Sequence, residues 1–424
     1  MEQRDIVKLS KIISHRLVQN AAFLILAQVI KLLARGTYVV LLAFYLGPEL
    51  LGLLNYSHHW YVIFFPLAVF GMPMVLSHDI GRYVDSREQK IRVSVASRLL
   101  TTIAATTACL GIVLVTETEP QARELICILT FALVARSFST WGSQVCVVME
   151  SAAPIPWITA IWRLTELFAA WILLHLDFSV ITLAWLHVAT YVGEAMTFYI
   201  LLRRRRVSLR PLFDTSQIRR FLELGALAGG AGFFQGLFHT APVLLFRWLG
   251  GFGEQLGNVS LVFQMLSMLL LFPKAINKAL LTRMSRKDQS SLKRRDIYLR
   301  FLSMYGTPTL FLGCLFTSLV GVPIAQRFIS SEYALMLELT QIAIWGLIPV
   351  FWALSAHQIL GSQAYFFQNA VTIFVAVAAT TMTIALGYSS FGVLIVAYAY
   401  LVGSSSWAIV GWLFVLDRRM VLRR

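Results

Sequence analysis

Long apolar runs alternate with short polar gaps along the whole chain. Runs of about twenty or more predominantly apolar residues recur, which is the length that an α-helix needs to cross the hydrocarbon core of a bilayer. The longest polar gap, residues 203–220, is too short to fold as a separate soluble domain. The pattern therefore predicts an all-α, polytopic membrane protein of about twelve transmembrane helices.

The predicted spans follow the apolar runs. They cover residues 17–46, 50–77, 93–116, 121–149, 156–176, 180–202, 221–248, 252–281, 298–321, 335–360, 366–386 and 390–416. The first six spans form a predicted N-terminal lobe and the last six a C-terminal lobe. The predicted parts of the chain are thus an amphipathic N-terminus, an N-lobe, a basic linker, a C-lobe and a basic tail, at residues 1–16, 17–202, 203–220, 221–416 and 417–424.

The composition agrees with a membrane protein. Hydrophobic residues make up 58% of the chain and charged residues only 13%, whereas a soluble domain has roughly 25% charged residues. The first 16 residues carry charges throughout and have no small-residue cleavage site before the first apolar run, so no cleavable signal is predicted. Their apolar positions suit either a helix on the membrane surface or a solvated tail.

Most of the 36 lysines and arginines lie in alternate connections between the predicted spans. They gather in the N-terminus, after Arg82, in the linker 203–220, after Arg283 and in the tail, whereas the intervening connections hold only Arg123, Arg247 and Arg327. By the positive-inside rule, both termini and the linker are predicted to be cytoplasmic. The net charge of +15 then belongs to one membrane face, which argues against nucleic-acid binding.

Two similar stretches indicate an internal repeat. LGPELLGLLNYS starts at Leu46, after the first predicted span, and LGGFGEQLGNVS starts at Leu249, after the seventh. Gly52 corresponds to Gly257, and a Phe-Pro pair and a basic connection follow in each half. Six spans per half predict two repeats related by an axis along the membrane normal, an arrangement in which transporters commonly hold substrate between the halves.

The first hairpin carries a family resemblance. The run LARGTYVVLLAFYLGPELLGLLNYS from Leu33, the later Phe70-Gly71-x-Pro73 and the run LFPKAINKAL from Leu271 resemble polysaccharide transporters, the Wzx-like O-antigen flippases of the multidrug/oligosaccharidyl-lipid/polysaccharide (MOP) superfamily. The resemblance implies a MATE-like fold of twelve helices in two six-helix lobes around a central cavity. It also implies that a polyprenyl-pyrophosphate-linked oligosaccharide is moved to the outer leaflet of the cell inner membrane for surface polysaccharide synthesis, with no cofactor. Membrane lipids and polysaccharide assembly proteins are the further partners that the resemblance implies.

The chain departs from the drug exporters of the same superfamily, which usually carry an acidic residue in the first or seventh span. Here the first span holds Lys31 and Arg35 and no acid, and Glu223 lies only at the start of the seventh. This favours an anionic substrate. Export of another amphiphile remains an alternative, whereas a membrane-embedded transferase is disfavoured because the outer connections are short and lack an acidic motif.

Charged residues inside the spans are the candidate site residues, because a charge at mid-membrane costs about 2.5–3.5 kcal/mol on insertion scales. Lys31 and Arg35 are i,i+4 neighbours, and His239 of the seventh span lies at the same predicted depth as Arg35. These cations are predicted to meet a pyrophosphate between the lobes. The alternatives are that Arg35 snorkels to the surface and that His239 is a packed neutral residue.

Three further cations complete the predicted binding set. Lys274 and Lys278 are i,i+4 neighbours in the eighth span, where they could meet the pyrophosphate at cytoplasmic entry or reach anionic headgroups. Arg136 lies near the middle of the fourth span. It is either another cavity cation or the partner of a carboxylate such as Glu166.

The fifth and sixth spans hold a separate charged group, Arg163, Glu166, His187 and Glu194. A short connection predicts that these spans are antiparallel neighbours. A buried pair of Arg163 with Glu166 or Glu194 is the structural alternative. The functional alternative is that the stripe of His187, Tyr191 and Glu194 relays protons for coupling. No metal site is predicted.

Overall fold

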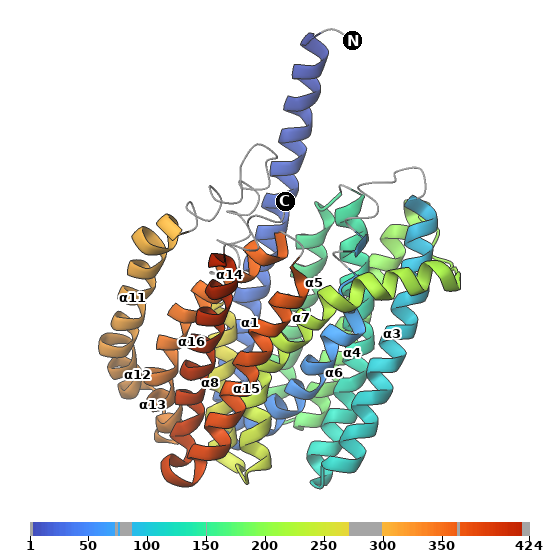
Figure 1. Cartoon of the computed structure of the whole chain (residues 1–424). Coiled ribbons are helices and arrows are strands. Elements are labelled where there is room, and N and C mark those ends of the chain that lie inside the picture. Colours follow the sequence, from blue (N-terminus) through green and yellow to red (C-terminus); the bar gives the residue numbers. More distant parts are fainter. Residues whose placement is uncertain are drawn as a thin grey trace. The chain divides into compact units, whose positions relative to one another are not determined.

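The computed structural model describes residues 3–72, 75–76, 87–149, 151–270, 299–362 and 365–417, and for residues 3–22, 24–25 and 227–228 the backbone alone. Every regular element in these ranges is a helix (Figure 1), so the all-α prediction is confirmed. The longer elements are α1 (Gln3–Val69), α3 (Arg87–Thr116), α4 (Pro120–Val148), α5 (Pro154–His175), α6 (Val180–Arg204), α7 (Thr215–Trp248), α8 (Gly253–Leu269), α11 (Thr307–Phe316), α12 (Val322–Phe328), α13 (Ala334–Ala343), α14 (Leu347–Ser362), α15 (Phe366–Phe391) and α16 (Ile395–Leu416).

Seven helical stretches of the described residues are long and apolar enough to cross a membrane, and the bent α7 makes an eighth. Two of these stretches, Leu26–Val69 and Phe366–Leu416, contain 44 and 51 residues; the first covers most of two predicted spans and the second covers all of two. The two spans of α1 join without a loop because the backbone turns at Gly47, with φ 68° and ψ 174°. A left-handed φ of this kind suits glycine, which has no Cβ.

The chain divides into two compact units. The N-unit consists of Met1–Tyr45 and Trp60–Gly229, and the C-unit of Leu46–His59 and Gly230–Arg424. The short middle segment of α1 therefore packs in the C-unit, and the division falls inside α7. The lobe boundaries expected at residues 203–220 stay a prediction.

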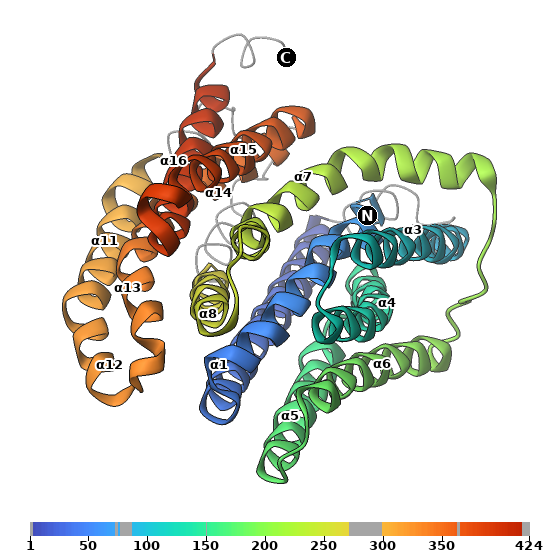
Figure 2. The same ribbon diagram turned by 90° about the horizontal axis from the view of Figure 1, so that it is seen from below.

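In the N-unit, α4 lies between α3 and α6, and α5 packs against α6 (Figure 2). Glycines, which have no side chain beyond Cα, allow these helices to approach one another closely. A Cβ at Gly142 of α4 would lie 2.5 Å from the Cβ of Phe198 on α6, and one at Gly193 would overlap the Trp162 ring of α5. Trp162 also donates a hydrogen bond to Thr197 Oγ1 at 2.9 Å. These contacts fix the α5–α6 hairpin that carries the charged residues.

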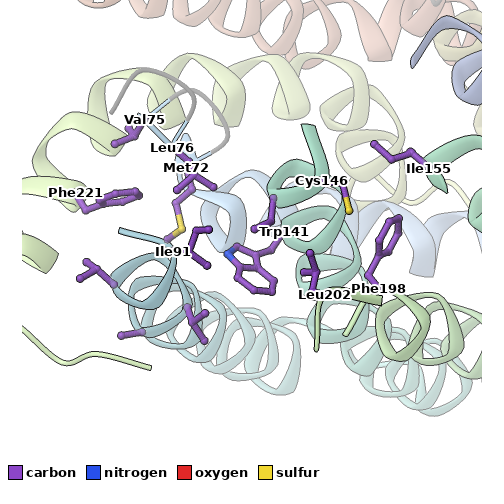
Figure 3. Packing of buried hydrophobic residues seen from close by; sticks show 14 of the residues in the cluster. Met72, Val75, Leu76, Ile91, Trp141, Cys146, Ile155, Phe198, Leu202 and Phe221 are labelled. Carbon is purple, nitrogen blue, oxygen red and sulfur yellow. The ribbon is translucent and has the colours of Figure 1, made fainter. Parts of the chain in front are cut away.

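A buried hydrophobic cluster joins the elements of the N-unit at one end (Figure 3). It includes Ile91 of α3, Trp141 of α4 and Phe221 of α7. Trp141 satisfies its indole N–H by donating to Ser94 Oγ at 2.9 Å, so its polar atom remains paired within the apolar surroundings. The cluster holds the start of α7 to the ends of α3 and α4.

In the C-unit, α16 packs against α13, α14 and α15. The α1 segment Leu46–His59 crosses α8 at two glycines that the sequence repeat pairs with each other. A Cβ at Gly52 would lie 2.5 Å from the backbone nitrogen of Gly257, and a Cβ at Gly257 would overlap the carbonyl of Pro48. Three residues after each glycine, Asn55 Nδ2 donates to Ser260 Oγ at 3.5 Å. Only glycine permits this approach of two backbones.

Candidate functional site

The charged residues of α5 and α6 form a compact ion-pair cluster in the N-unit. Arg163 of α5 donates through Nη1 to Glu166 Oε2, one turn along the same helix, and through Nη2 to Glu194 Oε2 of α6 at 3.1 Å. The exposed fractions of the three side chains are 10%, 6% and 4%. Of the two pairings proposed from the sequence, the structure contains both. They tie α5 to α6 in the interior of the unit.

His187 of α6 extends this cluster toward α1. Its Nδ1 lies 2.5 Å from Glu166 Oε1, and its Nε2 lies 3.0 Å from the hydroxyl of Tyr61. Because an ionised carboxylate only accepts hydrogen bonds, Nδ1 donates to Glu166, and in the neutral ring Nε2 accepts from Tyr61. The edge of the His187 ring also meets the Tyr191 ring, with centroids 4.9 Å apart.

Arg136 of α4 ends the chain of contacts. Its Nη1 donates to the Tyr61 hydroxyl at 3.1 Å, and its guanidinium carbon lies 4.3 Å from the centre of the Phe65 ring and 5.8 Å from that of Tyr191. Aromatic faces attract a cation at these distances. Among the described residues, no carboxylate pairs with Arg136. The sequence left open whether Glu166 is its partner. In the structure, Glu166 instead pairs with Arg163 and His187.

Arg35 of α1 lies close enough to this network to act on it electrostatically. Its charge interacts with Glu166, His187 and Tyr61, and its guanidinium carbon lies 5.8 Å from the centre of the Tyr38 ring. A charge retains much of its reach in surroundings that contain little water. Arg35, Arg136 and Arg163 therefore bring three positive charges to one region, against the carboxylates of Glu166 and Glu194.

The other predicted cations lie elsewhere in the chain. Lys31 lies one turn before Arg35 and is partly buried. His239 belongs to the C-unit, where its ring contacts that of Phe238 with centroids 5.1 Å apart. Lys274 and Lys278 lie outside the described residues. The facing of Arg35 and His239 across a lobe interface stays a prediction.

Sequence reasoning missed Tyr61 as a site residue. It bridges Arg136 and His187, although it is 75 residues from the first and 126 from the second along the chain. No spacing rule connects residues so far apart, and a tyrosine in an apolar run is equally expected at a membrane interface. Its hydroxyl orders two charged side chains that come from different helices.

This arrangement can bind an anion through the guanidinium of Arg136. The two carboxylates are engaged by Arg163 and His187, whereas Arg136 retains donors that no described side chain fills. An arginine guanidinium binds phosphate oxygens in pairs. The polar chain from Glu194 to Tyr61 sets the position of Arg136 through the Tyr61 hydroxyl.

Solved structures share the fold. The inward-facing conformation of a multidrug resistance MATE family transporter of the MOP superfamily has a TM-score of 0.73 and 16% identity, over 93% of this chain and 94% of that chain. A MOP superfamily transporter from Pyrococcus furiosus, whose binding pocket is described as having reverse polarity, has a TM-score of 0.66 and 13% identity over 96% of each chain. A mutant MATE transporter of Vibrio cholerae has a TM-score of 0.68 and 12% identity over 95% of each chain.

At these identities the structural likeness shows the fold, which confirms the MATE-like architecture predicted from the resemblance. No curated protein has a sequence that matches this chain. The profile of the polysaccharide biosynthesis protein family matches residues 17–288, well over half of the 424 residues. The resemblance to polysaccharide transporters of the MOP superfamily is thereby confirmed. This multi-pass membrane protein with a transporter fold belongs to the polysaccharide biosynthesis protein family.

Proposed function

We propose that this protein is a flippase that moves a polyprenyl-pyrophosphate-linked oligosaccharide from the cytoplasmic to the outer leaflet of the cell inner membrane, for surface polysaccharide synthesis. The movement proceeds by alternating access between two lobes. Both termini lie in the cytoplasm, consistent with the asymmetry of the basic residues. The protein acts as a transporter rather than as an enzyme.

The observation that supports this proposal is the position and the charge of Arg136. Its charge is held in place by Tyr61 and aromatic rings, and no carboxylate among the described residues neutralises it. A pyrophosphate loses hydration when it enters a membrane protein, and a fixed guanidinium offsets part of that cost. Arg35 adds a second positive charge nearby. Lys31 and His239 belong to the same proposed substrate path, as do Lys274 and Lys278 outside the described residues.

We assign a different role to Arg163, Glu166, His187 and Glu194. Their mutual contacts hold α5 against α6 and orient Tyr61, which in turn orients Arg136. A proton held between Glu166 and His187 would change the charge of the same cluster, so these residues are also the proposed site of any coupling to protons. The positioning role does not depend on that coupling.

Substitution of Arg136 tests the substrate proposal. Arg136→Gln removes the charge but keeps a side chain that can bond to Tyr61, so we expect loss of more than 90% of flipping with near-normal protein in the membrane. Arg136→Lys should restore only part of the activity, because a point charge replaces a two-pronged donor. The measurement is complementation of surface polysaccharide in a strain that lacks its own flippase, with protein level measured alongside.

Arg327→Gln is the matched control, since it removes an equally positive but exposed side chain from α12. It should complement fully. Full complementation by Arg136→Gln would exclude Arg136 as an essential cation of the substrate path.

Arg35 gives a second, independent test. Arg35→Ala should abolish complementation while the protein still reaches the membrane, and Arg35→Lys should recover part of it. If Arg35 merely reached the membrane surface, lysine would serve as well as arginine and alanine would be mild. Equal activity of the Lys and Arg forms would therefore remove Arg35 from the proposed site.

Export of another amphiphile, such as a drug, is the second candidate, because the solved relatives include multidrug resistance transporters. The first predicted span carries Lys31 and Arg35 and no acidic residue, which suits an anionic cargo. A drug-susceptible strain expressing the protein separates the two functions. Protection against cationic drugs without restoration of surface polysaccharide would favour the second.

A further inference from the structure

The connection from α6 to α7 presents a dense positive surface. Seven arginines lie on the end of α6, on the connection and on the first turns of α7, and all are exposed. They are Arg203, Arg204, Arg205, Arg206, Arg210, Arg219 and Arg220. We refer to them as the arginine platform.

The acidic residues of the same stretch are already engaged. Asp214 Oδ1 accepts hydrogen bonds from the backbone N–H groups of Ser216 at 3.0 Å and Gln217 at 3.1 Å, so Asp214 caps the start of α7. Hydrogen bonds from the Ser216 side chain and from Gln217 lower the pKa of Asp214, which keeps its carboxylate ionised at this cap. Glu223 pairs with Arg219 at 2.8 Å. Among the described residues, no other carboxylate pairs with an arginine of the platform, so six of its seven arginines have no carboxylate partner in this part of the structure.

The connection is anchored to the N-unit. Leu212 N donates to the carbonyl of Arg92 at 3.1 Å, and Arg92 Nε donates to the carbonyl of Arg210 at 3.2 Å. Val207 and Leu209 pack against the hydrophobic cluster of Figure 3. Their alternation with Ser208 and Arg210 directs apolar side chains inward and the arginine outward. The positive surface is thus held in a fixed position.

An exposed apolar belt adjoins the platform. On α6, Tyr199 and Ile200, four and three residues before Arg203, are 42% and 46% exposed, and on the neighbouring α5, Trp157 is 65% exposed. Phe213 in the connection is 61% exposed. Apolar side chains on the outside of a spanning helix face lipid tails, and aromatic residues are enriched at the level of the headgroups. A lipid lying along α5 and α6 would place its phosphate next to the end of α6.

We propose that the arginine platform binds the headgroups of anionic phospholipids in the adjacent leaflet, while the exposed ends of α5 and α6 contact their acyl chains. Guanidinium groups bind phosphate with charge-assisted hydrogen bonds, and basic segments beside a spanning helix attract anionic lipid. The apolar belt next to the arginines selects a lipid over a soluble acidic partner. This site is separate from the buried charges of α5 and α6.

The test uses the full-length protein, purified in detergent and titrated with phosphatidylglycerol or phosphatidylcholine, with bound lipid counted by native mass spectrometry. The double variant Arg203→Gln, Arg204→Gln should lower the apparent affinity for phosphatidylglycerol about 25-fold, or about fivefold for each arginine. The double variant Arg203→Lys, Arg204→Lys should keep most of it. Arg327 is an exposed arginine of the C-unit, and the Arg327→Gln variant should bind phosphatidylglycerol with the affinity of the unchanged protein.

Three results would overturn the proposal: unchanged affinity of the Gln variant for phosphatidylglycerol, equal affinity of the unchanged protein for phosphatidylcholine, or displacement of the lipid by millimolar inorganic phosphate. The last result would indicate a site for a free anion. The phosphatidylcholine titration reports general lipid contact, so a double variant that folds poorly should lose affinity for both lipids alike. In that case the single variant Arg210→Gln is tested in place of the double variant. Unchanged phosphatidylglycerol affinity in that variant would also count against the platform.

Discussion

The centres of the N-unit and the C-unit are held together by different forces. In the N-unit, Arg163 and His187 meet Glu166, and Tyr61 joins His187 to Arg136. In the C-unit, the Phe238 ring lies 5.4 Å from both the Tyr400 and the Trp407 rings, and the Phe263 ring lies 5.5 Å from Tyr400 (ring centroids). The first centre depends on directional bonds between charged groups, whereas the second depends on the fit of aromatic rings.

This difference shows where polarity has a purpose beyond packing. Taking charges out of water costs several kcal/mol for each ion, and apolar side chains can fill a bundle without that cost. The aromatic centre of the C-unit demonstrates that this protein can build such a core, with Tyr400 and Trp407 fully buried. The charged centre of the N-unit therefore fits a role in handling an anion, in agreement with the proposed function.

Removal of one shared carboxylate should have the largest effect on stability. Glu166→Ala leaves Arg163 with one carboxylate partner and His187 with none, and breaking a buried ion pair from one side costs about 3–5 kcal/mol. The free energy of unfolding of the purified protein, measured by denaturant titration in mixed micelles, should fall by that amount. Glu166→Gln keeps an oxygen acceptor and should lose less. A loss below about 1 kcal/mol for Glu166→Ala would mean that the cluster is solvated rather than buried.

In the C-unit, a larger side chain at the crossing of α1 and α8 should lower the free energy of unfolding. At Gly257, a methyl group would overlap the Pro48 carbonyl and lie 2.5 Å from its carbon, both of them backbone atoms that cannot rotate away. Gly257→Ala should therefore destabilise the protein by about 1–3 kcal/mol in the same unfolding assay. Gly313→Ala on α11 is the control, because nothing lies within 4 Å of its Cβ position. Equal stability of the two variants would show that the crossing of α1 and α8 is looser than described.

The sequence was sufficient to predict the helices and one part of the site. Apolar runs located the spans, because a helix needs about twenty consecutive, predominantly apolar residues to cross the hydrocarbon core of a bilayer. Arg163 and Glu166 are three residues apart, so helical geometry alone brings them together. The short turn between α5 and α6, with Asp177 at φ 56°, made Glu194 a predictable third member.

The remaining features depend on tertiary packing. The contact of Tyr61 with His187 follows from the approach of α1 to α6, which apolar runs do not encode. Likewise, the sequence could not decide whether Arg136 is a cavity cation or the partner of a carboxylate such as Glu166, because the two residues lie on different helices and their spacing along the chain does not fix a contact. The merging of two predicted spans into α1 depends on the backbone at Gly47. Propensity and periodicity describe each helix alone, whereas these features arise between helices.

The smallest expected change in stability follows from removal of a single hydroxyl group. The same change can be made in both units, at Tyr61 and at Tyr400, so it compares them directly. Tyr61 and Tyr400 are both fully buried. The Tyr61 hydroxyl bonds to His187 and Arg136, whereas the Tyr400 hydroxyl has no hydrogen-bond partner among the described residues. Phenylalanine at either position keeps the ring and removes only the hydroxyl.

Tyr61→Phe should cost about 0.6–1.7 kcal/mol, between the average and the maximum measured for hydrogen bonds between membrane helices, because it leaves two polar partners without their bridge. Tyr400→Phe should be neutral or slightly stabilising, because it removes a buried polar atom that makes no bond. Both variants are compared in the unfolding assay and in polysaccharide complementation, where only Tyr61→Phe should reduce activity through misplacement of Arg136. If Tyr400→Phe proved the more costly change, the core of the C-unit would rest on a polar contact, and the contrast between the two units would no longer hold.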